Sequence, residues 1–218
     1  MDKQLKVLKE RQEDIFVSLS SLLGAMASPV RIRLIHFLSQ APLTVEVMAS
    51  KVDESIANTS MHLRKMLNEG LVKVEVLGQK RLYSLTPSVV GFWEHLQDFA
   101  QRLDPGLVLE VADVYGDINW PHSLAETKKM IRSKEVLLLD VRPQDEVQEE
   151  DREYVMHIPQ ASLSASLKKI SKKKKVLVFC RGRLCALSAF SVNYLRENGY
   201  KAFRLDASWE NMKEIIHG

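Results

Sequence analysis

The hydrophobic pattern changes its period near residue 120, and this change constrains the fold more than any other feature of the chain. In residues 5–26 apolar side chains recur at helical spacing with charged residues between them. After residue 120, short apolar runs at 136–141 and 175–180 alternate with helical patterns. Strands that alternate with helices form parallel sheets, so the second half is predicted to be an α/β domain. A chain of 218 residues is long enough for two small domains.

The first half has the order of a mainly-α winged helix-turn-helix domain with a β-hairpin wing. Residue pairs that favour a helix start, such as Ser28-Pro29, separate its helices, and Gly70 ends the fourth helix. In the predicted hairpin, apolar and charged residues alternate around Gly78. The expected elements, in order, are a helix over 5–26, a second from Pro29 to near Gln40, a third over Thr44–Lys51, a fourth from Asp53–Ser55 to Asn68, a hairpin over 72–85 and a closing helix after Pro87.

The second half begins with a capping box, Ser123-x-x-Glu126, that opens a helix. Two strands of buried type follow, then a helix from about Cys185 to Asn198, and a last strand in YKAFRL. We therefore predict a winged helix-turn-helix domain over 1–102, a connector over 103–120 and an α/β domain over 121–218.

Composition limits where the protein works. The longest uncharged apolar runs, such as Val136–Leu139, have four or five residues, far fewer than the ~20 of a membrane-spanning helix. The N-terminus also lacks the apolar core of a signal peptide. We expect a cytoplasmic protein with no membrane partner, no metal and no cofactor. Lys and Arg number 31 against 28 Asp and Glu, so DNA binding must be argued from where the charges lie rather than from their total.

The fourth helix has an outward polar stripe that suits the major groove. Asparagine reads adenine edges, and arginine or lysine reads guanine or holds phosphate. Basic residues beside the hairpin tip can reach phosphate or the minor groove. A solvated helix shows a similar stripe, so this pattern alone leaves both interpretations open. The residues predicted to contact DNA are Asn58, Thr59, Met61, His62, Arg64, Lys65, Lys80 and Arg81.

The segments SPVRIRLIHFLSQ and ANTSMHLRKMLNEGLVKVEVLGQKRLYSL resemble the ArsR winged-helix family of dimeric transcription regulators over roughly residues 15–100. The resemblance implies binding to an operator in double-stranded DNA as a homodimer, with the first and last helices of the domain packed between subunits. Arsenic-sensing members carry a cysteine pair at the third helix, where this chain has Leu43–Val47. Soft metals need thiolate or imidazole ligands, so a signal must enter elsewhere.

The two cysteines of the chain, Cys180 and Cys185, bracket the turn between a strand and a helix. Backbone N–H groups and the helix dipole converge at such a turn and stabilise an anion. The pKa of Cys180 is therefore expected to be lowered, which makes it a nucleophile. The alternative is two ordinary buried cysteines, against which the charges of Arg181 and Arg183 argue.

The segments VLLLDVRP (136–143), HIPQA (157–161) and VFCR (178–181) resemble the rhodanese domain, over about residues 120–212. The resemblance implies that Cys180 accepts a sulfane sulfur from a small anionic donor such as thiosulfate, and that Asp140 and Arg142 support the loop. Met156 and Gln160 replace family glycines, and the Asp206–Met212 region departs from the family pattern. Thiosulfate sulfurtransferase activity is therefore expected to be weak. The resemblance also implies that the Arg181 and Arg183 side chains attract the anionic donor. The loop whose backbone amides are implied to cradle it consists of Arg181, Gly182, Arg183, Leu184, Cys185 and Ala186.

Three functions are compatible with these features. The first is a DNA-binding regulator that senses reactive sulfur or oxidants through Cys180, with Cys185 as the resolving thiol. The second is a sulfurtransferase for which DNA binding is secondary. The third is an inert rhodanese fold used for dimerisation or partner docking.

Overall fold

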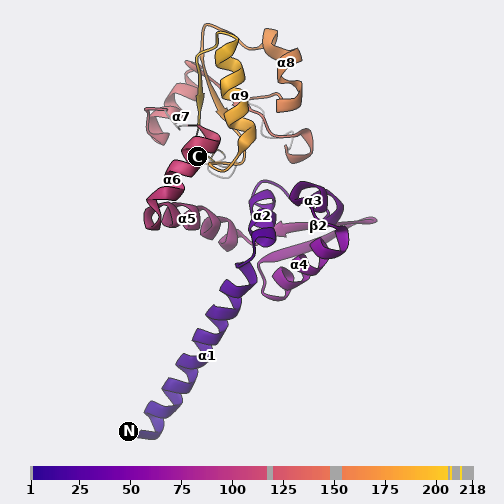
Figure 1. Ribbon diagram of the computed structural model, residues 1–218, viewed down its shortest axis with the longest axis vertical. Helices are drawn as coiled ribbons and strands as arrows, with labels where there is room; N and C mark the ends of the chain where they lie inside the picture. The colour runs from indigo at the N-terminus through magenta and orange to yellow at the C-terminus, as the bar shows by residue number, and fades with distance from the viewer. Residues whose placement is uncertain (1, 117–119, 148–153, 206, 208–211, 213–218) are drawn as a thin grey trace. The chain divides into compact units, whose positions relative to one another are not determined.

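The computed structural model describes residues 2–116, 120–147, 154–205, 207 and 212. It forms two compact units, Met1–Leu96 and Gln97–Gly218 (Figure 1). The segment predicted as a connector contains a helix, α6 (Pro105–Tyr115), that belongs to the second unit and packs against its helix α9 (Ala186–Glu197). Most of the Asp206–Met212 region, in which departures from the rhodanese pattern were noted, lies outside the described residues.

The first unit has the predicted winged helix-turn-helix order. Each helix starts at the expected signal: Thr44 caps α3 and Ser55 caps α4 through their hydroxyls, and Ser28 precedes Pro29 at the start of α2. Gly70 adopts a φ of 70° after α4, a conformation that favours glycine. The elements are α1 (Asp2–Met26), α2 (Pro29–Leu38), α3 (Val45–Val52), α4 (Ile56–Asn68), β1 (Val72–Leu77), β2 (Lys80–Leu85) and α5 (Pro87–Leu103).

The core of the first unit lies between α2, α3 and α4. Leu34, Ile35, Met48, Leu63 and Met66 are all fully buried there. The wing is an antiparallel pair that runs from Val72 opposite Leu85 to Leu77 opposite Lys80. Helical periodicity therefore places α4 with one face against the core and the other toward solvent.

The buried Arg31 closes the C-terminal end of α1. Its Nε donates to the carbonyl of Ala25 at 2.6 Å and its Nη2 to that of Gly24 at 3.0 Å. Such carbonyls have no partner within their own helix, so a guanidinium there stabilises the helix end. Arg31 thereby joins α1 to the core through α2.

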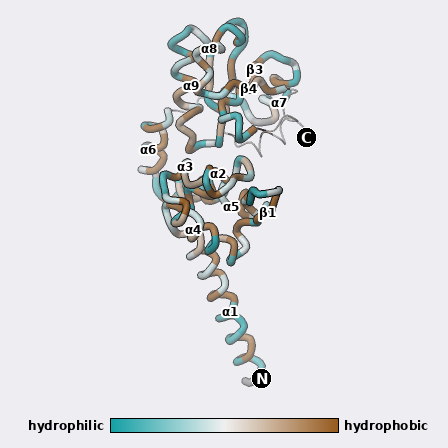
Figure 2. Tube along the Cα trace, turned by 90° about the vertical axis from the view of Figure 1, so that its right-hand side faces the viewer, coloured by the Kyte–Doolittle hydropathy of each residue, from teal (hydrophilic) through white to brown (hydrophobic). Residues whose placement is uncertain are grey.

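Helix α1 is otherwise exposed. Of its described side chains only Ala25 and Met26 are buried, and Figure 2 shows hydrophobic and hydrophilic residues alternating along it. No single described helix is long and apolar enough to cross a membrane, and α1 and α2 meet that test only as a pair bent by 82°. The large apolar side chains exposed on α1 are Leu5, Val7, Leu8, Ile15, Phe16, Val17, Leu19, Leu22 and Leu23.

The second unit confirms the predicted α/β class. Its four strands form one parallel sheet in the order β4-β3-β5-β6. The sequence did not predict β4, an edge strand in which only Val155 and Met156 are apolar and which follows a polar segment. The elements are α6, α7 (Leu124–Arg132), β3 (Val136–Asp140), β4 (Val155–His157), α8 (Leu163–Ser166), β5 (Lys175–Phe179), α9 (Ala186–Glu197) and β6 (Ala202–Arg204), with 3₁₀ turns at Gln144–Glu146, Gln160–Ser162 and Leu167–Lys169.

The sheet is buried on both faces, as expected for a parallel sheet. Val176 and Val178 of β5 face a core shared with α9, whereas Leu177 and Phe179 face a core that includes Ile131 of α7. The predicted capping box at the start of α7 is formed by Ser123 and Glu126. Strand β5 therefore ends in a fixed position, and Cys180 follows it directly.

Candidate functional site

The two thiols lie together at the carboxyl end of β5. Cys180 follows the strand, and Cys185 occupies the N-cap position of α9. Their Sγ atoms are 2.6 Å apart, in hydrogen-bond contact, and both residues are free thiols. They are 1% and 2% exposed. Gly182 between them has a φ of 90°, which lets the loop turn tightly enough to bring both ends together.

The pKa values of the two thiols are shifted in opposite directions. The hydrogen bond with Cys180, followed by the backbone N–H and the charge of Arg181, together lower the pKa of Cys185 to about 6 against the effect of its burial. The N-cap position adds the positive end of the α9 dipole. Burial raises the pKa of Cys180 well above its ordinary value, and the neighbouring Cys185 raises it further.

This corrects the expectation that Cys180 has the lowered pKa. The residue pattern correctly identifies a turn that stabilises an anion, but it does not show which sulfur faces the helix N-terminus. Cys180 belongs to the end of a buried strand, where ionisation is costly. Near neutral pH we therefore expect Cys185 to be ionised and Cys180 to be its hydrogen-bond donor.

Titration of the thiolate absorbance in the ultraviolet tests this assignment without any reagent having to reach the buried sulfurs. In the unmodified chain one thiolate is expected to appear as the pH rises through about 6. Cys185→Ser should abolish this transition. Cys180→Ser should move it to higher pH, because Cys185 loses the hydrogen bond that stabilises its anion. A transition near pH 6 that persists in Cys185→Ser would contradict the assignment.

Both loop arginines are paired with carboxylates. Arg181 contacts Glu146 through two hydrogen bonds, Nε to Oε2 at 2.7 Å and Nη2 to Oε1 at 2.5 Å, and Glu146 is buried. Arg183 contacts Asp98 at 3.1 Å. The sequence predicted that these arginines attract an anionic donor. In the structure their charges are largely balanced, which weakens that role.

Asp140 and Arg142 stand where the sequence predicted structural supports. The guanidinium of Arg142 donates to Asp140 from Nε at 3.0 Å and from Nη2 at 2.7 Å, and both side chains are 1% exposed. The N–H of Val141 bonds the carbonyl of Phe179 at 3.2 Å. The Val141–Phe179 bond therefore holds the end of β3 beside the end of β5, from which Cys180 follows, and the Asp140–Arg142 pair fixes the residues next to that bond.

Sequence reasoning missed three residues of the site: Glu146, Ser188 and Arg204. Glu146 stands in a polar segment and gives no signal. Ser188 lies one turn into α9, where its hydroxyl donates to the carbonyl of Cys185 at 3.0 Å. Arg204 could have been noticed as a charged residue within the apolar strand YKAFRL, a position that is costly unless the charge is bonded.

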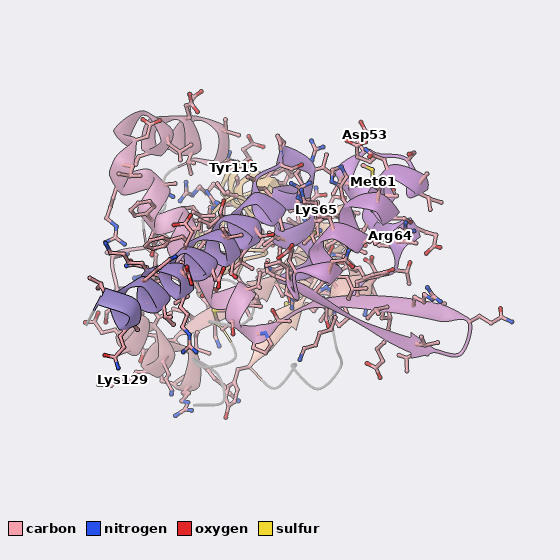
Figure 3. All side chains as sticks on the ribbon, turned by 90° about the horizontal axis from the view of Figure 1, so that it is seen from below. Asp53, Met61, Arg64, Lys65, Tyr115 and Lys129 are labelled. Atoms are coloured by element: carbon pink, nitrogen blue, oxygen red, sulfur yellow. The ribbon has the colours of Figure 1, made fainter. Side chains whose placement is uncertain are left out.

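The predicted DNA-binding residues fall into an exposed and a buried group. Met61 is 58% exposed, and Arg64 and Lys65 are exposed on the same helix (Figure 3). Lys80 and Arg81 are exposed at the tip of the wing. Asn58 is half-buried, and its amide donates to Glu54 at 2.7 Å. The exposed group forms a basic surface on α4 and the wing.

Two predicted contacts need correction. Thr59 is fully buried against the core, because it lies on the same face of α4 as Leu63, and it is not available to DNA. The ring of His62 lies 3.1 Å from Nη1 of Arg31. Burial lowers the pKa of His62, and the charge of Arg31 lowers it further, so this histidine is neutral near pH 7 and joins α4 to Arg31.

Two domain families match the chain. The family described as a helix-turn-helix domain matches residues 26–75, and the family described as a rhodanese-like domain matches residues 123–215. The first match covers α2, α3, α4 and the start of the wing. The second covers the whole parallel sheet and the dithiol loop.

Proteins of known name or structure are similar to this chain over part or most of its length. The HTH-type transcriptional regulator Rv0324 of Mycobacterium tuberculosis is 26% identical over 84% of this chain and 81% of its own length. The thiosulfate sulfurtransferase GlpE of Coxiella burnetii is 29% identical over 40% of this chain and 81% of its own length. Among solved structures, a homodimeric winged helix-turn-helix domain from Mycobacterium bovis aligns with 43% of this chain and 88% of its own, at 21% identity and a TM-score of 0.41.

Proposed function

We propose that this chain, which joins a winged helix-turn-helix domain to a rhodanese-like domain, is a transcriptional regulator whose Cys180–Cys185 dithiol detects reactive sulfur species or oxidants. The contact between the two sulfur atoms, 2.6 Å apart on one loop, carries the proposal. The regulator Rv0324 supports it, since its similarity extends over both domains. We place the protein in the cytoplasm, where a reducing environment keeps the pair as thiols until a signal arrives.

The proposed reaction has two steps. The Cys185 thiolate attacks the outer sulfur of a small organic persulfide, R–S–SH, and the S–S bond breaks to leave Cys185–S–SH and R–S⁻. Cys180 then attacks the inner sulfur of this persulfide, which forms the Cys180–Cys185 disulfide and releases H₂S. A two-electron oxidant such as diamide gives the same disulfide by accepting two electrons and two protons from the dithiol. The roles of the two cysteines are exchanged relative to the sequence prediction.

A sulfurtransferase is the second candidate, favoured by the similarity to GlpE. Its persulfide would have to survive until an acceptor arrives. Here a second thiol lies in contact with the first, so the persulfide is expected to be resolved into a disulfide before transfer. A thiosulfate-to-cyanide assay separates the two functions, because a transferase turns over repeatedly and a sensor reacts once.

DNA binding by the full chain provides the test. With DNA from upstream of its own gene, treatment with an organic persulfide is expected to change affinity by about ten-fold, within the usual range of coupling between two sites. Cys185→Ser and Cys180→Ser should bind untreated DNA normally and lose the response. Mass spectrometry of Cys180→Ser should show the persulfide trapped on Cys185. A normal response in both variants would rule out dithiol sensing and leave the rhodanese-like unit a docking module.

Arg64→Ala and Lys65→Ala are each expected to weaken DNA binding by about ten-fold and to reduce its salt dependence. Both side chains are exposed on the outer face of α4, where a recognition helix meets base edges and phosphates. Lys73→Ala, an exposed lysine on β1 near the base of the wing, serves as the control. Fluorescence anisotropy at several salt concentrations measures the effect, and equal losses at all three positions would point to non-specific binding only.

A further inference from the structure

Arg204 caps the C-terminal end of α6. Its guanidinium is buried, and Nη1 donates to the carbonyls of Tyr115 at 2.9 Å and Gly116 at 3.3 Å. These are the last residue of α6 and the residue that follows it, where carbonyls lack partners within the helix. The ring of Tyr115, labelled in Figure 3, also lies 5.6 Å from the guanidinium carbon. A cation at this end of a helix also interacts favourably with the negative end of the helix dipole.

The same guanidinium also holds the dithiol loop. Nη2 of Arg204 donates to the carbonyl of Arg183, which lies between the two cysteines. Nε donates to the hydroxyl of Ser188 at 3.2 Å, and that hydroxyl in turn donates to the carbonyl of Cys185 at 3.0 Å. One planar group therefore bonds the loop, the first turn of α9 and the end of α6.

A second contact links the same loop to the helices before the sheet. The side chain of Arg183 pairs with Asp98 on α5 at 3.1 Å. Helix α5 ends at Leu103 and α6 begins at Pro105, with Asp104 between them as the N-cap. Helices α5 and α6 are thus separated by one residue, and α5 spans the boundary between the two units.

We propose that Arg204 is a positioning residue that couples the chemical state of the Cys180–Cys185 dithiol to the C-terminal end of α6. This coupling depends on the proposed function only in one respect, namely that the state of the dithiol regulates DNA binding. A disulfide joins the two ends of the loop and removes the thiolate charge, so the carbonyl of Arg183 changes position. Because the donors of a guanidinium lie in one rigid plane, the group cannot follow that carbonyl and keep its bonds to Tyr115 and Gly116.

Hydrogen exchange of the full chain tests this coupling without DNA. In the unmodified protein, converting the dithiol to the disulfide with diamide is expected to speed amide exchange in the last turn of α6 by about five-fold or more. Arg204→Lys keeps the positive charge but lacks the planar set of N–H donors. Amide exchange in the last turn of α6 should then be fast in both the dithiol and the disulfide state, and the difference between the two states should vanish. A purely structural role would raise exchange in both states and preserve the difference.

Ser188→Ala provides a milder variant that removes only the hydroxyl between Arg204 and Cys185, and it should reduce the response. Arg196→Lys is the matched control, since Arg196 donates to the carbonyl of Ala202 in the same unit, away from the loop. An unchanged α6 in the disulfide form of the unmodified protein overturns the coupling. If α6 responds while DNA affinity does not, the coupling stands and the proposed function fails.

Discussion

Asp140→Ala is expected to lower the free energy of unfolding of the second unit by about 3–5 kcal/mol, because it removes one member of a buried ion pair. Arg142 would lose the carboxylate that it contacts through both Nε and Nη2, in a place where each side chain is 1% exposed. Water cannot replace that partner without opening the end of β3. Native-state hydrogen exchange of the β3 and β5 amides in increasing urea measures the loss for this unit separately.

Asp98→Ala is the matched control, since it also removes a carboxylate from an arginine in the same unit. The Asp98 and Arg183 side chains are 52% and 25% exposed, and exposed pairs contribute at most about 1 kcal/mol. Similar losses in the two variants would show that burial does not set the strength of the Asp140–Arg142 pair. Such a result would also contradict the proposed role of the Asp140–Arg142 pair as a support for the dithiol loop.

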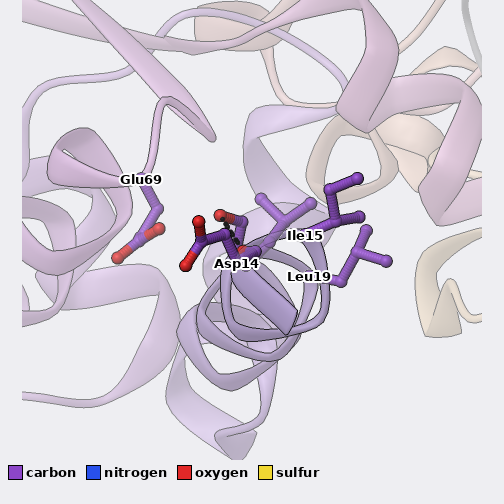
Figure 4. A pocket seen from close by; sticks show the side chains of 6 residues that line it. Asp14, Ile15, Leu19 and Glu69 are labelled. Carbon is purple, nitrogen blue, oxygen red and sulfur yellow. Dashed lines mark hydrogen bonds between the residues drawn. The ribbon is translucent and has the colours of Figure 1, made fainter. Parts of the chain in front are cut away.

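Replacing Ile15 and Leu19 of α1 by aspartate is expected to convert the proposed homodimer into monomers and to weaken operator binding by about 100-fold. Leu8, Ile15, Leu19 and Leu22 form an exposed apolar row along one face of α1. Contiguous exposed apolar surface marks interaction sites, and we propose that a second copy of the chain covers this row. Ile15, Leu19 and Leu22 line a groove of 470 Å³ that also borders Glu69 (Figure 4). The loss of affinity follows because two linked half-site contacts gain about 10²–10⁴ in affinity over one.

Light scattering coupled to gel filtration reports the oligomeric state, and anisotropy reports DNA affinity. The control places aspartate at Lys6 and Ser20, which lie on the opposite side of the same helix and are also exposed. It should remain dimeric, because it leaves the apolar row intact. If the control dissociates as readily as the Ile15 and Leu19 variant, charge on α1 rather than its apolar row governs association.

Features encoded by neighbouring residues were read correctly from the sequence. The helix starts at Ser28-Pro29, Thr44 and Ser55, the hairpin around Gly78 and the Ser123–Glu126 capping box all depend on contacts within a few residues. The parallel sheet followed from the alternation of strands and helices. Strand β4 was missed because it follows a polar segment and only two of its residues, Val155 and Met156, are apolar.

The properties of the site arise from contacts between residues far apart in the sequence. Glu146 balances Arg181 from 35 positions away, and Arg204 reaches Tyr115 across 89. The local pattern was enough to place two thiols on one anion-stabilising turn. Which sulfur carries the charge, and which helix responds to it, depends on burial and distance in three dimensions, since both set the cost of an ion in a folded chain.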